Sequence, residues 1–271
     1  MQLRDLADAV GLALYEKIGS RLYLTTAGDE LVKTARAMVE EWSSFEQRID
    51  AMKGLTRGRL SVAVVSTAKY FVPRMLGDFC RAYPEIDIAL HVLNRDGVVA
   101  RMRENRDDLY IMSIPPSDID LEQHPFLRNP LVVIAPKRHP LAGGKTVALT
   151  RLAAERFILR ERGSGTRLAC EAHFDSARFL PQVHLEIGSN EAIKQAVAAG
   201  MGIAVISRHA LVATEAQLAI LPVRGFPLHS NWSILYPRGK RLSPIATAFL
   251  EHLKDPSQSG HSDRGIWGSR R

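Results

Sequence analysis

The amino-acid sequence predicts an α/β fold that is preceded by a long coiled-coil helix. A chain of 271 residues, 46% of them hydrophobic, is long enough for about two domains with buried cores. From Gly58 onward, apolar segments of strand length alternate with helical patterns, as in a mostly parallel sheet flanked by helices. Before Gly58, apolar residues follow a heptad repeat through the segment 27–53, which indicates a coiled coil.

The first 25 residues are expected to form a short helix and a β-hairpin. Apolar residues in the segment 1–10 have helical spacing, and Gly11 ends that pattern. The segments 14–16 and 21–24 then alternate as two short strands around the turn residues 18–20, which is typical of a hairpin.

The segment from about Ala27 to Lys53 is predicted to be one helix, opened by a capping box of Thr26 and Asp29. Its apolar residues are spaced alternately four and three apart, which is the 3.5-residue period of a coiled-coil seam. A helix that packs on its own core would drift to a 3.6-residue period, and this remains the alternative. We expect a dimerisation seam of Leu31, Ala35, Met38, Trp42, Phe45, Ile49 and Met52.

Polar residues lie at the carboxyl ends of strands predicted at 60–65, 86–93 and 109–114, and a fourth strand is predicted at 131–135. Ser66 and Thr67 are expected to cap a helix toward Cys80, and a second helix is expected from the segment 94–97 through Met102. Ligands of such sheets bind beyond the carboxyl ends of the strands. Singly, each polar residue there is an ordinary cap or turn residue, but together they predict a ligand site: Ser66, Thr67, Asn94, Arg95 and Ser113.

A glycine-containing loop flanked by arginines predicts an anion site farther along the chain. Glycine admits positive φ and lets backbone N–H groups approach a ligand. The loop, 163–166, precedes a helix expected at 167–176, and a second helix start follows at 189–191. The segment 137–231 carries 12 Lys and Arg against 7 Asp and Glu, which favours an anionic ligand. Ordinary glycine turns and scattered surface cations are the alternative.

Other features limit the class of protein. The two cysteines, Cys80 and Cys170, are too few for a disulfide framework or a metal site. Neither a membrane-spanning run nor a signal peptide is recognisable. We therefore expect a reducing, cytoplasmic setting. Motifs typical of enzymes are missing, and Glu122 with His124 is expected in a solvated loop, so we predict no enzymatic activity, cofactor or metal. The segment 256–271 is expected to be disordered.

The sequence resembles LysR-type transcriptional regulators over residues 1–255. EKIGSRLYLTTAGDEL resembles the wing and the start of the linker helix of that family. RGRLSVAVVSTAKYFVPRMLGDFCRAYPEIDI resembles the first strand, helix and strand of its effector domain. Within the family, HVLNRDGVVARM, IAPKRHPLAG, LRERGSGTRLACEAHF and SNEAIKQAVAAGMGIAVIS look most like the regulators of Calvin-cycle (RuBisCO operon) genes.

The resemblance implies a partial winged helix-turn-helix at 1–25, a linker and dimerisation helix at 26–57, and an effector domain of the periplasmic-binding-protein type II fold at 58–255. Lobe I would be 58–136 and 239–255, lobe II 137–231, and the hinge strands would lie near 131–137 and 232–238. MQLRDLADAVG resembles only the end of the recognition helix and its link to the wing, so base readout by this chain alone is not expected. DNA phosphate contacts are expected from Lys17, Ser20 and Arg21 on the wing.

The resemblance also implies that a small anionic effector, a phosphorylated metabolite or NADPH, binds between the lobes and shifts a homodimer or homotetramer on promoter DNA between two states. Two alternatives stay open: regulation of another pathway such as aromatic catabolism, and a ligand-binding or dimerisation module without DNA binding of its own. The expected effector site comprises Ser66, Thr67, Asn94, Arg95, Ser113, Arg160, Gly163, Ser164, Gly165, Thr166, Arg167 and Asn190.

Overall fold

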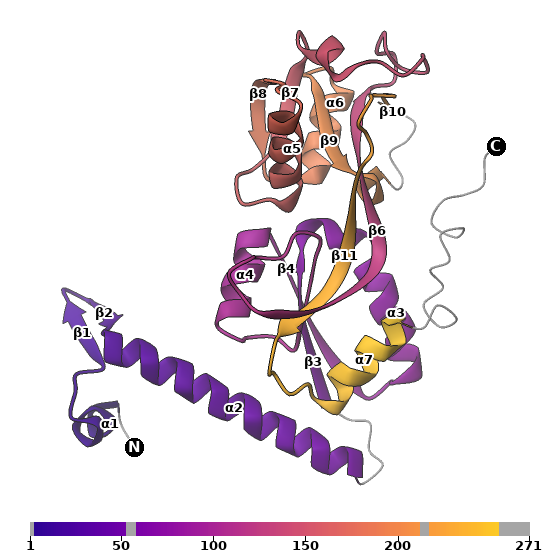
Figure 1. Ribbon diagram of the computed structural model, residues 1–271. Coiled ribbons are helices and arrows are strands. Elements are labelled where there is room, and N and C mark those ends of the chain that lie inside the picture. Colours follow the sequence, from indigo (N-terminus) through magenta and orange to yellow (C-terminus); the bar gives the residue numbers. More distant parts are fainter. Residues whose placement is uncertain (1–2, 53–57, 212–216, 255–271) are drawn as a thin grey trace.

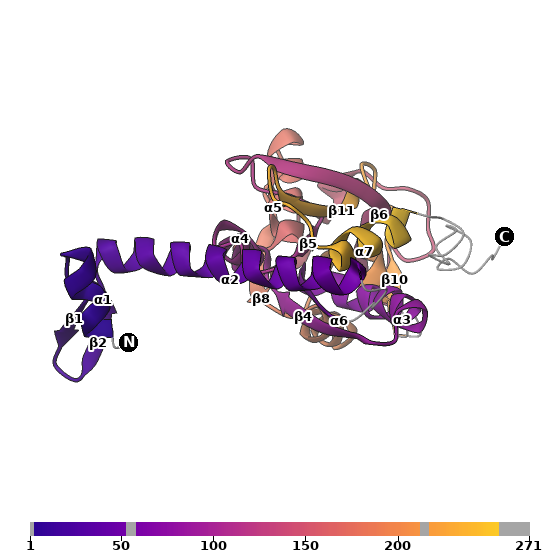
Figure 2. The same ribbon diagram turned by 90° about the horizontal axis from the view of Figure 1, so that it is seen from below.

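The computed structural model describes residues 3–52, 58–211 and 217–254. One long helix, α2 (Thr26–Met52), lies along one side of an α/β body and extends beyond it (Figure 1). The helix α1 (Leu3–Val10) and a two-stranded hairpin lie at its far end, away from the body, as the view from below also shows (Figure 2). The predicted order of hairpin, long helix and α/β body is confirmed, and the tail predicted to be disordered lies outside the described residues.

The hairpin consists of β1 (Tyr15–Ile18) and β2 (Arg21–Leu24), which pair antiparallel around a two-residue turn. Gly19 in this turn has φ +64, a conformation that favours glycine. The expected capping box at Thr26 is wrong by one residue. Thr25 caps α2 instead, because its Oγ1 accepts a hydrogen bond from Gly28 N (3.1 Å) while donating one to Ala13 O (2.6 Å).

Part of the apolar seam of α2 is exposed to solvent, although Glu40 in the same stretch contacts the body. Met38, Trp42 and Phe45 are 69%, 62% and 43% exposed, which is unusual for large apolar side chains on one helix. Trp42 and Phe45 contact each other, with their ring centroids 5.6 Å apart. The side chain of Met52 lies outside the described residues. The dimerisation role of this seam stays a prediction.

The body contains a continuous mixed sheet, not the mostly parallel sheet predicted from the sequence. In its first half, β3 (Gly58–Val65) pairs in parallel with β4 (Ile86–Leu93) and β5 (Leu109–Met112). In its second half, β7 (Arg156–Arg160) pairs in parallel with β8 (Gln182–Ile187) and β9 (Ile203–Ser207). Each half is therefore a parallel unit of its own.

Two long antiparallel strands cross from one half to the other: β6 (Leu121–Pro136) and β11 (Leu228–Pro237), as Figure 1 shows. The short strand β10 (Leu218–Ile220) pairs with β6. The sequence indicated only the apolar end of β6, at 131–135, because the residues before it alternate between buried and exposed positions and include two prolines. The expectation that Glu122 and His124 lie in a loop is wrong, since both are in β6.

Helices cover both halves of the sheet. In the first half they are α3 (Val72–Ala82), α4 (Arg95–Arg103) and α7 (Pro244–Lys254), and in the second half α5 (Gly165–Ser176) and α6 (Asn190–Ala198). Short 3₁₀ helices lie at η1 (Ser66–Tyr70), η2 (Leu149–Leu152) and η3 (Arg208–Leu211). None of the described helices is long and apolar enough to cross a lipid bilayer.

Three local predictions need correction. Ser66 and Thr67 belong to η1 and do not cap α3, which begins after Phe71 with a proline in its first turn. The third strand ends at Met112, so Ser113 follows it. The helix expected from Arg167 begins two residues earlier, at Gly165.

Apolar side chains form separate cores in the two halves. Trp232 and Phe249 belong to a core of the first half, and Phe157 and Phe174 to a core of the second. Strand β11 contributes to both sides, because Trp232 packs in the first half and Leu228 against the second. The crossing strands therefore join two cores that are otherwise distinct.

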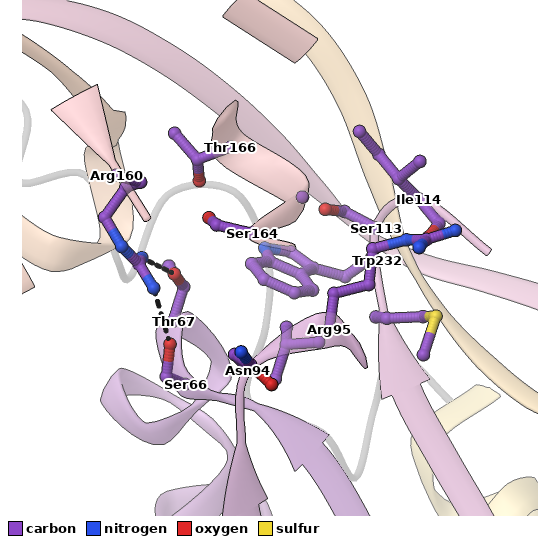
Figure 3. A pocket seen from close by; sticks show the side chains of 13 residues that line it. Ser66, Thr67, Asn94, Arg95, Ser113, Ile114, Arg160, Ser164, Thr166 and Trp232 are labelled. Carbon is purple, nitrogen blue, oxygen red and sulfur yellow. Dashed lines mark hydrogen bonds between the residues drawn. The ribbon is translucent and has the colours of Figure 1, made fainter. Parts of the chain in front are cut away.

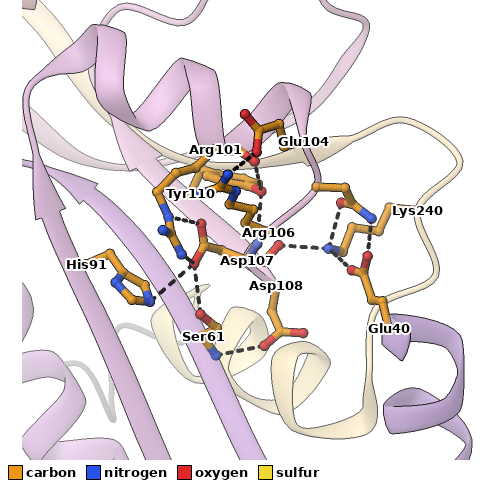
Figure 4. Close-up of polar contacts among 11 residues, drawn as sticks. Glu40, Ser61, His91, Arg101, Glu104, Arg106, Asp107, Asp108, Tyr110 and Lys240 are labelled. Atoms are coloured by element: carbon orange, nitrogen blue, oxygen red, sulfur yellow. Dashed lines mark hydrogen bonds and ion pairs between the residues drawn. The ribbon is translucent and has the colours of Figure 1, made fainter. Parts of the chain in front are cut away.

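A polar network fastens α2 to the first half of the body (Figure 4). Lys240 Nζ donates to Asn105 Oδ1 (2.9 Å) and Asp107 O (2.7 Å), and it also contacts the Glu40 carboxylate of α2. The Asp107 side chain is fully buried and accepts two hydrogen bonds of 2.8 Å from Arg101. Its neighbour Asp108 accepts a hydrogen bond from Ser61 N (2.7 Å).

These adjacent aspartates are expected to respond in opposite directions to the same substitution. Asp107→Asn leaves the Arg101 guanidinium without its counter-charge and should destabilise the fold by about 3 kcal/mol. Burial raises the pKa of Asp108, so its charged form is disfavoured in the fold. A raised carboxyl pKa stabilises the fold only below the unfolded-state pKa, and that contribution is lost as pH rises toward the folded-state value. Asp108→Asn should therefore stabilise the protein more at pH 7 than at pH 4.

Urea unfolding of both variants at the two pH values measures these effects. An Asp108→Asn variant that is destabilised at pH 7, or equally affected at both pH values, would contradict this account.

Candidate functional site

A small polar cavity lies between the two halves of the body, where strands of both halves end (Figure 3). Nine of the twelve residues predicted for the site line it: Ser66, Thr67, Asn94, Arg95, Ser113, Arg160, Ser164, Gly165 and Thr166. Four residues that the sequence did not indicate complete it: Val65, Met112, Ile114 and Trp232. The other three predicted residues, Gly163, Arg167 and Asn190, are not among the lining residues.

Arg95 is the arginine that the first half contributes to the lining of the cavity. Asn94 caps α4 by accepting a hydrogen bond from Gly97 N (2.9 Å), and this places Arg95 at the first position of the helix. Arg95 Nε donates to Ile114 O (2.8 Å), and one terminal nitrogen lies 3.7 Å from Asp96 Oδ1. Among the described residues, its terminal N–H groups have no hydrogen-bond acceptor, so they are available to an anion.

Arg160, from the second half, is by contrast fully engaged. Its side chain is 2% exposed, and Nε and Nη2 bind the two Glu161 carboxylate oxygens at 2.7 and 2.9 Å. Nη2 also donates to Ser66 Oγ (3.1 Å), and Nη1 donates to Thr67 Oγ1 (3.5 Å) and Asn190 Oδ1 (2.9 Å). These contacts use all five donors of the guanidinium. Arg160 therefore bridges the halves, and Glu161 neutralises its charge.

Two further residue pairs hold the halves together beside Arg160. Asn190, the first residue of α6, donates from Nδ2 to Thr67 Oγ1 (3.1 Å), while the preceding Ser189 caps the helix. Tyr70 of the first half donates its hydroxyl to Glu191 of the second half (2.6 Å). Burial and the Glu191 carboxylate raise the pKa of Tyr70, so this hydrogen-bond donor is retained at neutral pH.

The start of α5 faces the cavity from the second half. Ser164 occupies the N-cap position and is 3% exposed, but its side chain makes no capping hydrogen bond. Gly165 and Thr166 follow as the first helical residues and line the cavity. The first backbone N–H groups of a helix have no partner within that helix, and they attract anions.

Gly163 lets the loop before α5 approach the first half closely. Its φ is +81, and a Cβ built there would lie 2.1 Å from Asp96 Oδ2 of α4. Arg167 supports the same loop, because its Nη1 donates to Arg160 O (3.1 Å) and lies 3.4 Å from Glu186. Both residues shape the site without lining the cavity.

The cavity has a volume of about 20 Å³, which is room for one water molecule. A larger ligand therefore needs the halves to separate. Such a movement breaks the hydrogen bonds that join opposite walls. These are the bonds from Arg160 to Ser66 and Thr67, from Asn190 to Thr67, and from Tyr70 to Glu191.

Sequence reasoning missed the apolar lining for two different reasons. Val65 and Met112 are the last residues of β3 and β5, so the strand-end rule that selected their polar neighbours could also have found them. Trp232 lies on the crossing strand β11, and no local motif relates that strand to the cavity.

Glu122 and His124 of β6 contact neighbouring side chains. His124 stacks on Tyr236 with ring centroids 5.7 Å apart, and burial followed by the nearby Lys254 charge lowers its pKa. Glu122 pairs with Arg238 at 3.5 Å. Within the described parts of the chain, no three His, Cys, Asp or Glu side chains are grouped so as to hold a metal ion.

Comparisons with known proteins agree with the fold. The family model of the LysR substrate binding domain matches residues 53–257. The RuBisCO operon transcriptional regulator of Acidithiobacillus ferrooxidans is 45% identical over 97% of this chain and 85% of that protein. The HTH-type transcriptional activator CmpR of Synechocystis is 44% identical over 93% of this chain and 84% of that protein.

A solved structure is similar at the level of the effector domain. The regulatory domain of CcmR from Synechocystis PCC6803, in complex with 2-phosphoglycolate, superposes with a TM-score of 0.71 at 50% identity. The match covers 73% of this chain and 96% of that domain. The fold, the family model and relatives that are regulators rather than enzymes all lead to one assignment: this chain belongs to the LysR family of transcriptional regulators.

Proposed function

We propose that this chain regulates carbon-fixation genes in response to a small phosphorylated anion bound between its two lobes. The main observation is that Arg95, whose terminal N–H groups have no acceptor among the described residues, and the start of α5 line the same cavity between the lobes. In addition, the chain is 50% identical to a regulatory domain that was solved with 2-phosphoglycolate. The RuBisCO operon regulator at 45% identity supports the target genes. The lobes are 58–136 with 239–255, and 137–231, joined by the hinge segments 131–137 and 232–238.

The charges in the cavity suggest how such an anion is held. The terminal N–H groups of Arg95 meet one anionic group bidentately, as guanidinium suits phosphate and carboxylate. The backbone N–H groups at the start of α5 meet the same group or a second one. The hydroxyls of Ser66, Thr67 and Ser113 supply neutral donors around them. A small bifunctional anion such as 2-phosphoglycolate suits this arrangement, whereas NADPH needs a much wider opening.

The response of the protein is a shift between lobe arrangements. In the arrangement that the structure shows, which we call the closed form, Arg160 donates to two hydroxyls and an amide of the protein. The closed form is therefore stable without a ligand. An anion that enters between the walls changes the free energy of this form relative to an open one, and the ligand favours whichever arrangement it contacts better.

Promoter DNA and a second copy of the chain are the partners we propose. Lys17, Ser20 and Arg21 are exposed on the hairpin and supply contacts to DNA phosphates. The exposed seam of α2 pairs with the same seam of a second protomer in a homodimer, from which a tetramer can assemble. Because it would bind promoter DNA, we propose that the protein acts in the cytoplasm.

Removal of the Arg95 charge should weaken the effector. Loss of a charged hydrogen-bonding partner costs about 1.5–3 kcal/mol, so Arg95→Ala should reduce the affinity for 2-phosphoglycolate about 10- to 100-fold in a calorimetric titration. Arg162→Ala removes the same charge from an exposed position that does not line the cavity, and serves as the control. Equal affinities of the two variants would refute the proposed role of Arg95, and saturable binding of muconate alone would refute the phosphorylated effector.

Disruption of the α2 seam should dissociate the oligomer. Met38→Lys places a charge in the centre of the proposed apolar seam and is expected to yield monomers in sedimentation velocity. Ala37→Glu introduces a charge at a neighbouring exposed position outside the seam and should leave the oligomer intact. An unchanged sedimentation coefficient for Met38→Lys would show that the seam does not mediate dimerisation.

A further inference from the structure

Trp232 carries a polar atom whose place in the fold is unusual. The side chain belongs to the crossing strand β11 and is 1% exposed. Its indole Nε1 is buried and has no hydrogen-bond acceptor among the residues that the structure describes. Buried donors without partners are rare in native proteins because each one loses its hydrogen bonds to water without replacement.

This nitrogen lies at the candidate effector cavity. Trp232 is one of the residues that line it, and Figure 3 shows the indole ring between Asn94 and Ser164, with its nitrogen on the side of Ser164. The ring is fixed from behind by Phe71, with centroids 5.2 Å apart. A register irregularity of the β6–β11 pairing falls between Trp232 and Ser233, a feature that commonly re-aims a side chain. The donor is therefore held rigidly at the wall of the cavity.

Protein acceptors already engage most of the neighbouring arginine donors, and among the described residues only the terminal N–H groups of Arg95 are available as Trp232 is. All five donors of Arg160 are engaged by protein acceptors, and Arg95 Nε is engaged by Ile114 O. The Trp232 N–H group is uncharged and can only donate a hydrogen bond. It therefore favours a ligand that places an acceptor oxygen next to it. A carboxylate or phosphate oxygen placed there would satisfy it.

We propose that the indole N–H of Trp232 donates a hydrogen bond to an anionic oxygen of the bound effector and that Trp232 is thereby a specificity-determining residue of the site. This inference rests on the proposed function, since it assigns a further contact to the same effector. Because Trp232 belongs to β11, the contact joins the effector directly to a strand that connects the two halves. The ligand thus contacts both walls and the hinge.

The first test observes the indole proton itself in the unaltered chain. The sequence contains three tryptophans, Trp42, Trp232 and Trp267, so a chain labelled with ¹⁵N-tryptophan gives three indole signals. Trp42→Phe and Trp267→Phe variants assign two of them. Saturation with 2-phosphoglycolate should move the Trp232 proton signal downfield and slow its exchange with solvent.

The second test measures affinity by calorimetry with the same probe. Trp232→Phe keeps an aromatic ring but removes the donor, and the affinity for 2-phosphoglycolate should fall about tenfold or more. Trp267→Phe, which removes an indole outside the proposed effector domain 58–255, should bind as tightly as the unaltered chain.

The outcomes separate this inference from the proposed function. Normal binding by the unaltered chain with an unmoved Trp232 signal, or equal affinity of the Trp232→Phe variant, overturns the role of Trp232 and leaves the proposed function standing. If the unaltered chain binds no 2-phosphoglycolate, the proposed effector is refuted, and the role of Trp232 is refuted with it.

Discussion

The arrangement of the body depends on one buried cation, Arg160. A guanidinium removed from water is tolerated only when its charge and its donors are matched, and here Glu161 supplies the charge while Ser66, Thr67 and Asn190 supply the remaining acceptors. Since these acceptors belong to both halves, the same interaction that makes the burial of Arg160 tolerable also closes the cavity. Arg160 is thus satisfied by the protein itself, and Arg95 and the start of α5 remain to receive an anion when the halves separate.

The two crossing strands, β6 and β11, link the closing of the cavity to the rest of the molecule. Strands β6 and β11 are the pair that joins the cores of the two halves, so a change in the angle between the halves has to be absorbed along them. Shortly after β11 ends, Lys240 contacts Glu40 of α2 and two oxygens of the loop before β5. The long helix is therefore fastened near the end of a hinge strand. This connection offers a physical route from the cavity to the helix that bears the hairpin.

Local sequence signals indicated nine of the residues that line the cavity, and the reasons are visible in the structure. Asn94 and Arg95 follow β4 as a cap and first helical residue, which is a relation encoded within four residues. The start of β6 escaped prediction because Pro125, Pro130 and alternating polar residues conceal a strand whose partners are distant in sequence. The sequence likewise showed that Arg160 is a cation beside a glycine loop but not that its donors are already engaged. Trp232 was missed because only the crossing of β11 brings it to the cavity.

A crystal structure of the chain with 2-phosphoglycolate tests the central claim most directly. We predict that the anionic groups lie against the terminal nitrogens of Arg95 and the first N–H groups of α5, with Glu161 still bound to Arg160. A phosphate that replaces Glu161 on the Arg160 guanidinium, or a ligand bound outside the cavity between the halves, would contradict it.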